Sequence, residues 1–148
     1  MNIINEFKLT VDSKSINESF CRVVVSSFIT PLDPTIDEIS DLKTAVSEAV
    51  TNCIVHAYKD TYGKINITGV ITDDNIVKIK IKDNGIGISK ENQQRIFERF
   101  YRVDKSRSKE TGGTGLGLAI VKHIVELHDA RIYLESEVDK GTQIRIVF

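Results

Sequence analysis

The fold is decided by residues 47–58, which read SEAVTNCIVHAY. Apolar side chains recur at steps of three and four from Ile39 to Ala57, and this spacing predicts an amphipathic helix. Glu48, Asn52 and His56 recur every four residues, so they share a polar stripe beside the apolar one. Because most helices have an exposed polar face, the meaning of this stripe depends on the rest of the chain.

Helix and strand patterns lie on both sides of this stretch. Thr35 and Glu38 form a capping-box pattern, which predicts that the helix begins there. Alternating apolar residues predict strands over 7–11, 65–67 and 77–81, and a closing hairpin from 132–134 and 144–146. An earlier helical pattern, which we expect to pack inward as one apolar stripe, consists of Ile16, Phe20, Val23, Val24 and Phe28.

The order of these elements is strand, helix, helix, strand, strand, loop, helix, strand, strand. It predicts an α+β fold: a two-layer sandwich in which a mostly antiparallel sheet carries helices on one face. The chain has 148 residues and no linker-like segment. We therefore expect one domain spanning 1–148.

An acidic residue and two glycines follow the predicted strand at 77–81. Asp83 at the strand end is suited to accept a hydrogen bond from an exocyclic amino group, which would favour adenine over guanine. Gly85 and Gly87 allow the backbone to approach a ligand closely. Taken alone, Asn84-Gly85 is also typical of a hairpin turn.

A second glycine loop covers 112–117 and leads directly into a helix. Clustered glycines at a helix N-terminus present free amide groups and a positive dipole end, which favour phosphate. A flexible cap is the alternative. The loop is not a Rossmann fingerprint, because no strand immediately precedes it, and it lacks the Gly-Lys-Ser/Thr of a Walker loop.

Composition limits the other function classes. The chain has 20 Lys+Arg against 21 Asp+Glu, a formal charge of -1, so no overall field attracts it to nucleic acid or an acidic membrane, and any basic patch must be local. No apolar run reaches a membrane-spanning length, and the N-terminus lacks a secretion signal, so we expect a cytoplasmic protein. Cys21 and Cys53 lie within apolar helical patterns and are interpreted as buried hydrophobes.

The ordered set Glu48…Asn52, Asp83-x-Gly85-x-Gly87, Phe97…Phe100 and Gly113-x-Gly115-x-Gly117 resembles the N, G1, F and G2 boxes of the Bergerat-fold ATPases. The front of the chain, including residues 17–23 and 47–58, is similar to the sporulation anti-sigma-F factors. From Asp83 onward it is closer to sensor histidine kinases. The two-part likeness fits either a divergent natural member or a hybrid.

This resemblance implies roles for individual residues. Asn52 would hold Mg²⁺, Glu48 would act as general base, Asp83 would read adenine, and His56 would lie in the nucleotide pocket. Arg102, Lys105 or Arg107 would supply charge to the γ-phosphate. The remaining ATP-binding candidates are Gly85, Gly87, Gly113, Thr114, Gly115, Leu116, Gly117 and Thr142.

The resemblance also implies partners. No His stands in a phosphoacceptor context, because His56, His123 and His128 precede Ala, Ile and Asp. The expected phosphoacceptor is a serine on an anti-anti-sigma protein, with a sigma factor as the other partner and Arg22 at a contact position. A homodimer would form through residues 7–28. The alternatives are a histidine-kinase-type ATP-binding module without phosphotransfer, and an adaptor whose glycine loops are relics.

Overall fold

One antiparallel sheet with the strand order β1-β2-β3-β5-β4 forms a complete layer of the molecule. The structure is a computed structural model that describes residues 1–58, 61–103 and 115–148. Its strands are β1 (Ile3–Asp12), β2 (Lys64–Thr72), β3 (Val77–Asp83), β4 (Arg131–Glu137) and β5 (Gly141–Val147). All neighbouring strands pair antiparallel, as the alternating sequence patterns predicted.

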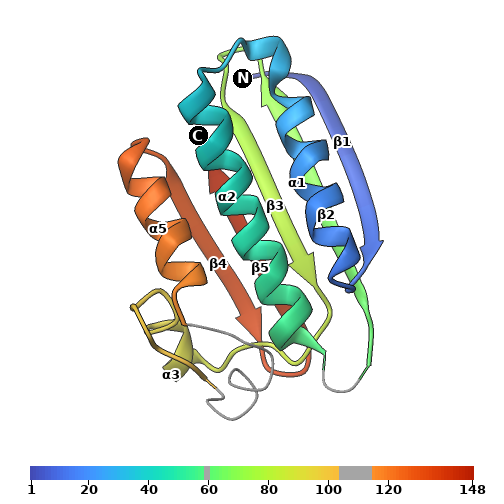
Figure 1. Cartoon of the computed structure of the whole chain (residues 1–148), viewed down its shortest axis with the longest axis vertical. Coiled ribbons are helices and arrows are strands. Elements are labelled where there is room, and N and C mark those ends of the chain that lie inside the picture. The colour runs from blue at the N-terminus through green and yellow to red at the C-terminus, as the bar shows by residue number, and fades with distance from the viewer. Residues whose placement is uncertain (59–60, 104–114) are drawn as a thin grey trace.

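The helices form the second layer. The helical segments are α1 (Ile16–Phe28), η1 (Thr30–Leu32), α2 (Ile36–Asn52), η2 (Cys53–Ala57), α3 (Lys90–Gln93) and α5 (Gly117–Leu127). Figure 1 shows α1, α2 and α5 side by side over the same face of the sheet, with α2 in the centre. The predicted two-layer α+β sandwich is therefore confirmed.

Helix α2 begins at the predicted capping box. The backbone N–H of Glu38 donates to the Thr35 hydroxyl at 3.1 Å, and the N–H of Thr35 donates to the Glu38 carboxylate at 3.4 Å. The far end differs from the prediction, because the α-helix ends at Asn52 and residues Cys53–Ala57 form a π-helical turn. Such turns are rare and often lie at functional sites.

The prediction for α1 was confirmed for Phe28, which packs against the core, but it was wrong for three other residues of the predicted stripe. Ile16, Phe20 and Val23 are 81%, 50% and 50% exposed, whereas Cys21 and Val25 are fully buried. The helix packs on α2, and its buried Cys21 and Val25 belong to the same core cluster as the fully buried Ala49 of α2. Small side chains let the two helices approach closely, and this leaves the larger apolar residues outside.

The core lies between α2 and the central strands. Isoleucines at alternate positions of β2 and β3 face the helices with almost no exposed surface, among them Ile65, Ile67, Ile79 and Ile81. Cys21 and Cys53 are both buried and free, which confirms their interpretation as small hydrophobes.

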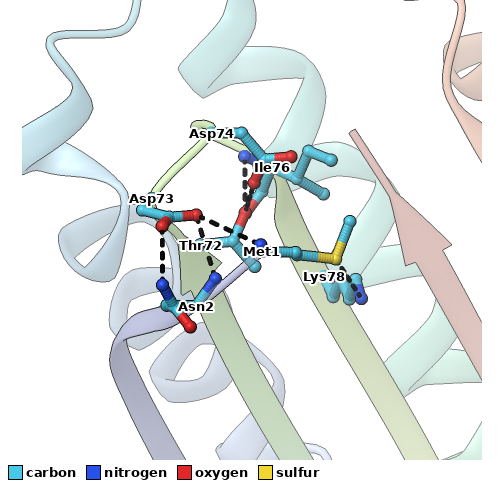
Figure 2. A network of polar contacts seen from close by, with 7 residues as sticks. All are labelled: Met1, Asn2, Thr72, Asp73, Asp74, Ile76 and Lys78. Carbon is cyan, nitrogen blue, oxygen red and sulfur yellow. Dashed lines mark hydrogen bonds and ion pairs between the residues drawn. The ribbon is translucent and has the colours of Figure 1, made fainter.

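The N-terminus is fixed to the turn between β2 and β3, as Figure 2 shows. Asn2 donates from its backbone N–H and its side-chain amide to the two carboxylate oxygens of Asp73, at 2.9 and 3.1 Å. The terminal ammonium of Met1 lies 3.9 Å from the same carboxylate. These contacts place β1 at the edge of the sheet, in register with β2.

Candidate functional site

The residues singled out in the sequence converge on one end of the sandwich. The C-terminal end of α2 with η2, the end of β3, the start of β5 and the start of α5 all meet there, at the lower end in Figure 1. This convergence follows from the topology, because the strands on both sides of β3 run antiparallel to it.

Asp83 is the buried acidic group of this end. Its side chain is only 2% exposed, and its Oδ1 atom accepts hydrogen bonds from the backbone N–H of Gly85 at 2.9 Å and of Thr142 at 3.2 Å. Two backbone donors on one oxygen fix the orientation of the side chain. The orientation of Asp83 is thus set by β5 and by its own loop.

Thr142 binds Asp83 through its backbone N–H, whereas its side chain contacts β4. Its hydroxyl lies 2.8 Å from the hydroxyl of Ser136 on β4, which in turn donates to the carbonyl of Gly141 at 2.9 Å. Ser136 also accepts the N–H of Ile88 at 2.8 Å, so it joins the first glycine loop to the β4–β5 hairpin. Sequence reasoning missed Ser136, because a serine in an alternating strand gives no distinguishing signal.

The two glycines of the first loop are required by the protein's own backbone. A Cβ on Gly85 would stand 2.1 Å from the carbonyl oxygen of Ala57, and one on Gly87 would stand 2.1 Å from that of Glu137. Gly87 also has a φ of +71°, a conformation that favours glycine. The loop therefore packs closely against η2 and the β4–β5 hairpin. These two contacts fix the position of Asp83.

Glu48 lies on α2 where that helix faces the start of α5. A Cβ on Gly117 would stand 2.7 Å from the Oε2 atom of Glu48, so the missing side chain leaves room for this carboxylate. Burial raises the pKa of the Glu48 carboxyl, and the nearby carboxylate of Glu18 raises it further. A carboxyl with a raised pKa is a better proton acceptor near neutral pH.

Glu18 is a second residue that the sequence did not reveal. It lies on α1, accepts a hydrogen bond from the hydroxyl of Ser47 on α2, and pairs with Arg22 at 3.9 Å. The residue next to Ser47 is Glu48, so α1 contributes a negative charge to the surroundings of the proposed base. Contacts between separate helices cannot be read from local spacing.

Three further predicted site residues are half-buried. Asn52 is the last residue of α2, one turn beyond Glu48, and is half-buried. His56 is half-buried in η2, one residue before the Ala57 carbonyl that meets Gly85. Arg102 is half-buried outside any helix or strand.

The second glycine loop is only partly covered by the structure. Gly113 and Thr114, like Lys105 and Arg107, lie outside the described residues. At the loop's far end Gly115 has a φ of +75°, and its carbonyl accepts the N–H of Phe100 at 2.9 Å. This hydrogen bond joins Phe100 and Gly115, the residues that flank segment 101–114. Leu116 then precedes the first residue of α5.

The buried thiol of Cys53 contacts Asp83, the acidic residue at the start of the first glycine loop. Burial raises the pKa of its thiol well above the ordinary value, and the charge of Asp83, to which the thiol donates a hydrogen bond, adds to the effect. The thiol therefore stays protonated and acts as a buried donor. Asp83 is held by two backbone amides and this thiol.

Residues 1–58, 61–103 and 115–148 contain neither a membrane-spanning helix nor a protein-only metal cluster. They contain no helix that is both long and apolar enough to cross a bilayer. Nor do they bring together three His, Cys, Asp or Glu side chains that could hold a metal ion by themselves.

Comparison with known proteins agrees with this geometry. Residues 37–148 match the family of histidine kinase-, DNA gyrase B- and HSP90-like ATPases. The anti-sigma F factor of Clostridium botulinum (strain Alaska E43 / Type E3) is 44% identical over 144 residues, which cover 96% of this chain and 92% of that protein. The chain belongs to the anti-sigma F factor family of these ATPases.

A second member of the anti-sigma F factor family, from Geobacillus thermodenitrificans (strain NG80-2), is 38% identical over 142 residues, which cover 95% of this chain and 89% of that protein. Among solved structures, the mycobacterial sensor histidine kinase MprB has a TM-score of 0.65 and 24% identity, over 95% of this chain and 97% of that one. ShkA, solved in complex with AMPPNP, has a TM-score of 0.60 and 23% identity over 74% of this chain and 21% of its own. These structures show the shared fold, and the family shows an ATPase domain.

Proposed function

We propose that this anti-sigma F factor is an ATP-dependent protein kinase that phosphorylates a serine of an anti-anti-sigma protein and also binds a sigma factor. The observation that carries the proposal is the position of Glu48. Its carboxylate lies at the start of α5, directly after the second glycine loop, and its pKa is raised by burial and by Glu18. A carboxylate in this place is suited to act on a hydroxyl that approaches a bound phosphate.

The nucleotide would be held by the groups that converge around Glu48. Asp83 would accept a hydrogen bond from the adenine amino group, since two backbone N–H groups fix the orientation of its carboxylate. The phosphates would face the N-terminus of α5 and the loop that contains Gly113, Thr114 and Gly115. Thr142 would support Asp83 from the opposite side.

Magnesium fits this donor set. The side-chain amide oxygen of Asn52 is the kind of ligand that Mg²⁺ accepts, and this ion is usually held by one or two protein oxygens together with substrate phosphates. The described residues offer no larger cluster that would favour another metal. When bound, Mg²⁺ would neutralise phosphate charge, with Asn52 as its protein ligand.

Transfer would proceed by proton removal at Glu48. The carboxylate would take the proton of the serine hydroxyl while the serine oxygen bonds to the γ-phosphorus and the bond from that phosphorus to ADP breaks. Arg102 would supply positive charge near the transferred group. Catalysis of this kind rests mainly on positioning and charge stabilisation.

The decisive experiment is phosphate transfer from labelled Mg-ATP to an anti-anti-sigma protein, with the parent compared to Glu48→Ala. We expect serine phosphorylation by the parent and its loss in the variant by a factor of about 100 or more, while nucleotide affinity changes little. Glu48→Gln is the matched variant that keeps the shape and removes the charge. Full transfer by both variants would exclude Glu48 as the base.

The partners would be recognised near α1. Arg22 is partly exposed and pairs with Glu18, so a partner carboxylate that binds Arg22 would compete with this ion pair. A cytoplasmic location is part of the same proposal, since sigma factors act there. Arg22→Ala should weaken partner binding in a pull-down while leaving ATP binding intact, and unchanged partner binding would remove Arg22 from the interface.

A homodimer through β1 and α1 is also proposed. The exposed apolar residues of this region lie on the outer side of α1 and at the start of the edge strand, namely Ile3, Ile4, Ile16, Phe20 and Val23. Apolar patches of this kind mark interaction sites. Light scattering at increasing concentration should show a dimer that Phe20→Ser weakens. A mass that stays monomeric at every concentration would contradict it.

An ATP-binding module without phosphotransfer is the second candidate. It is favoured by the fold shared with histidine-kinase structures and by the resemblance of the chain from Asp83 onward to sensor histidine kinases. Thermal unfolding with Mg-ATP separates both candidates from an adaptor role, because ligand at 100 times the dissociation constant adds about 2.7 kcal/mol of stability. Absence of any shift at saturating nucleotide would favour the adaptor.

A further inference from the structure

The face of the sheet opposite the helices carries a concentration of positive charge. In Figure 1, α1, α2 and α5 all lie on the other face. Along β3 the side chains that point away from the core are Lys78, Lys80 and Lys82, alternating with the buried Val77, Ile79 and Ile81. Consecutive lysines on this strand are separated by two residues, or about 6.7 Å.

The strand register adds an arginine and an aromatic ring to these lysines. Lys80 pairs with Arg145 of β5, and Arg145 pairs with Tyr133 of β4. The Arg145 guanidinium lies over the Tyr133 ring at 4.6 Å from its centroid, and Tyr133 is 40% exposed. On the other side of Lys80, Thr68 of β2 pairs with Lys8 of β1. We define the basic strip as Lys78, Lys80, Lys82 and Arg145.

No carboxylate forms an ion pair with the basic strip within the described part of the chain. None of its four residues takes part in an ion pair there, and the Nε of Arg145 is buried without a hydrogen-bond partner. Lys78 contacts the sulfur of Met1 at 3.8 Å (Figure 2), and its charge adds weakly to the Thr72 hydrogen bond that lowers the pKa of Asp74. Because Lys80 and Arg145 are direct cross-strand neighbours, their like charges destabilise the sheet. An anionic partner would relieve this repulsion.

The shape of the strip limits what that partner is. Acidic residues lie on the outer strands, with Glu6 on β1 and Glu135 and Glu137 on β4. A broad acidic protein surface would meet these carboxylates, whereas a single polyanionic strand lying along β3 and β5 would avoid them. Open antiparallel sheets with an exposed aromatic ring are one of the ways in which proteins bind single-stranded nucleic acid.

We propose that the basic strip, with Tyr133 at its side, binds single-stranded nucleic acid. The lysines would contact successive phosphates, and a base would stack on the Tyr133–Arg145 pair. The strip lies on the sheet face away from α1, α2 and α5, and it shares no residue with the nucleotide site. The proposal is therefore independent of the kinase function proposed above.

The test is fluorescence anisotropy with a fluorescein-labelled oligouridylate of about 15 nucleotides, a length that spans the site size of such surfaces. We expect binding that weakens with salt, with a slope of log K against log[salt] of about -2 to -3 for three or four phosphate contacts. Lys80→Glu should weaken binding at least tenfold, and Lys80→Gln should reduce the slope by about 0.7. Saturating AMPPNP should leave the binding unchanged.

Matched controls make the assignment falsifiable. Lys122→Glu changes the net charge by the same amount at an exposed position of α5, on the other side of the molecule, and should have little effect. Tyr133→Leu tests stacking, since it should weaken binding with no change in the salt slope. Equal losses in Lys80→Glu and Lys122→Glu, or no binding even at low salt, would overturn the proposal. Equally strong competition by a polyglutamate peptide would instead assign the strip to acidic protein segments.

Discussion

The Glu48 carboxylate of α2 lies directly over Gly117, the first residue of α5, where a Cβ would stand 2.7 Å from its Oε2 atom. Among the described glycines of the second loop, only Gly117 has its missing side chain directed at a carboxylate. Gly115 by contrast faces the backbone of Phe100. A change at Gly117 therefore tests the position of the proposed base.

Gly117→Ala should displace the Glu48 side chain and leave the fold intact. The atom met by the new Cβ is the end of a flexible side chain, and alanine suits a helix at least as well as glycine. We expect serine phosphorylation to fall about tenfold, with unfolding free energy unchanged or raised by about 0.5 kcal/mol. Kinetics and denaturant titration measure the two effects. In the double variant with Glu48→Ala, the Gly117 change should cause no further loss.

Asp83→Asn should weaken ATP binding and reduce the preference for ATP over GTP. Gly85 and Thr142 donate to the same oxygen of Asp83, so an amide oxygen that keeps both bonds leaves the nitrogen facing the adenine amino group, and the opposite orientation turns the nitrogen toward both backbone donors. A lost or repulsive buried hydrogen bond costs about 1–3 kcal/mol, or a factor of about 10 to 100 in affinity. Competition titration with both nucleotides checks this. An unchanged ATP affinity would remove Asp83 from the site.

Gly85→Ala should destabilise the whole site by moving the first loop. Its Cβ would meet the Ala57 carbonyl oxygen at 2.1 Å, and a backbone atom cannot rotate away. We expect a loss of about 1–3 kcal/mol in unfolding free energy together with weaker nucleotide binding. The comparison variant is Ser136→Ala, which removes hydrogen bonds of the same loop but adds no clash and should cost less. If Gly85→Ala retained full stability, the close approach would be refuted.

Glu48→Gln should change how stability depends on pH. The pKa of this carboxyl is higher in the folded protein than its ordinary value of 4.5, so the folded state holds the proton more strongly. The group therefore lowers stability as pH rises from about 4.5 through the folded pKa. The variant lacks this loss, and its stability relative to the parent should increase over that window. Urea titrations across the range measure the difference.

Glu18→Gln tests whether the charge of Glu18 contributes to this pH effect. Burial is the first cause of the raised pKa of Glu48, and the charge of Glu18 is the second. Removing that charge should bring the pKa of Glu48 part of the way back, so the destabilisation on raising the pH should become smaller without disappearing. A pH dependence identical to that of the parent would show that Glu18 does not act on Glu48.

Local patterns were sufficient for most of the fold. Capping at Thr35 and Glu38, the alternating strands and the closing hairpin depend on neighbours in the chain, and the structure confirms them. The α1 face could not be predicted in this way, because both possible stripes are apolar and the choice depends on how closely α2 approaches. The glycine loop at Gly85 and Gly87 was located correctly, but its close contacts are with the protein backbone.

The sequence by itself determined the order of the elements, their caps and the family, since periodicity, turn chemistry and ordered motifs are local properties. Only the tertiary structure decided which distant residues meet. Packing of α1 and α5 on α2 places Glu18 and Gly117 beside Glu48, which sets the environment of that carboxylate. Strand register places Lys80 beside Arg145, although 65 positions separate them in the numbering of a chain whose net charge is only -1. Local charge and burial depend on these long-range contacts, and no short stretch of sequence contains them.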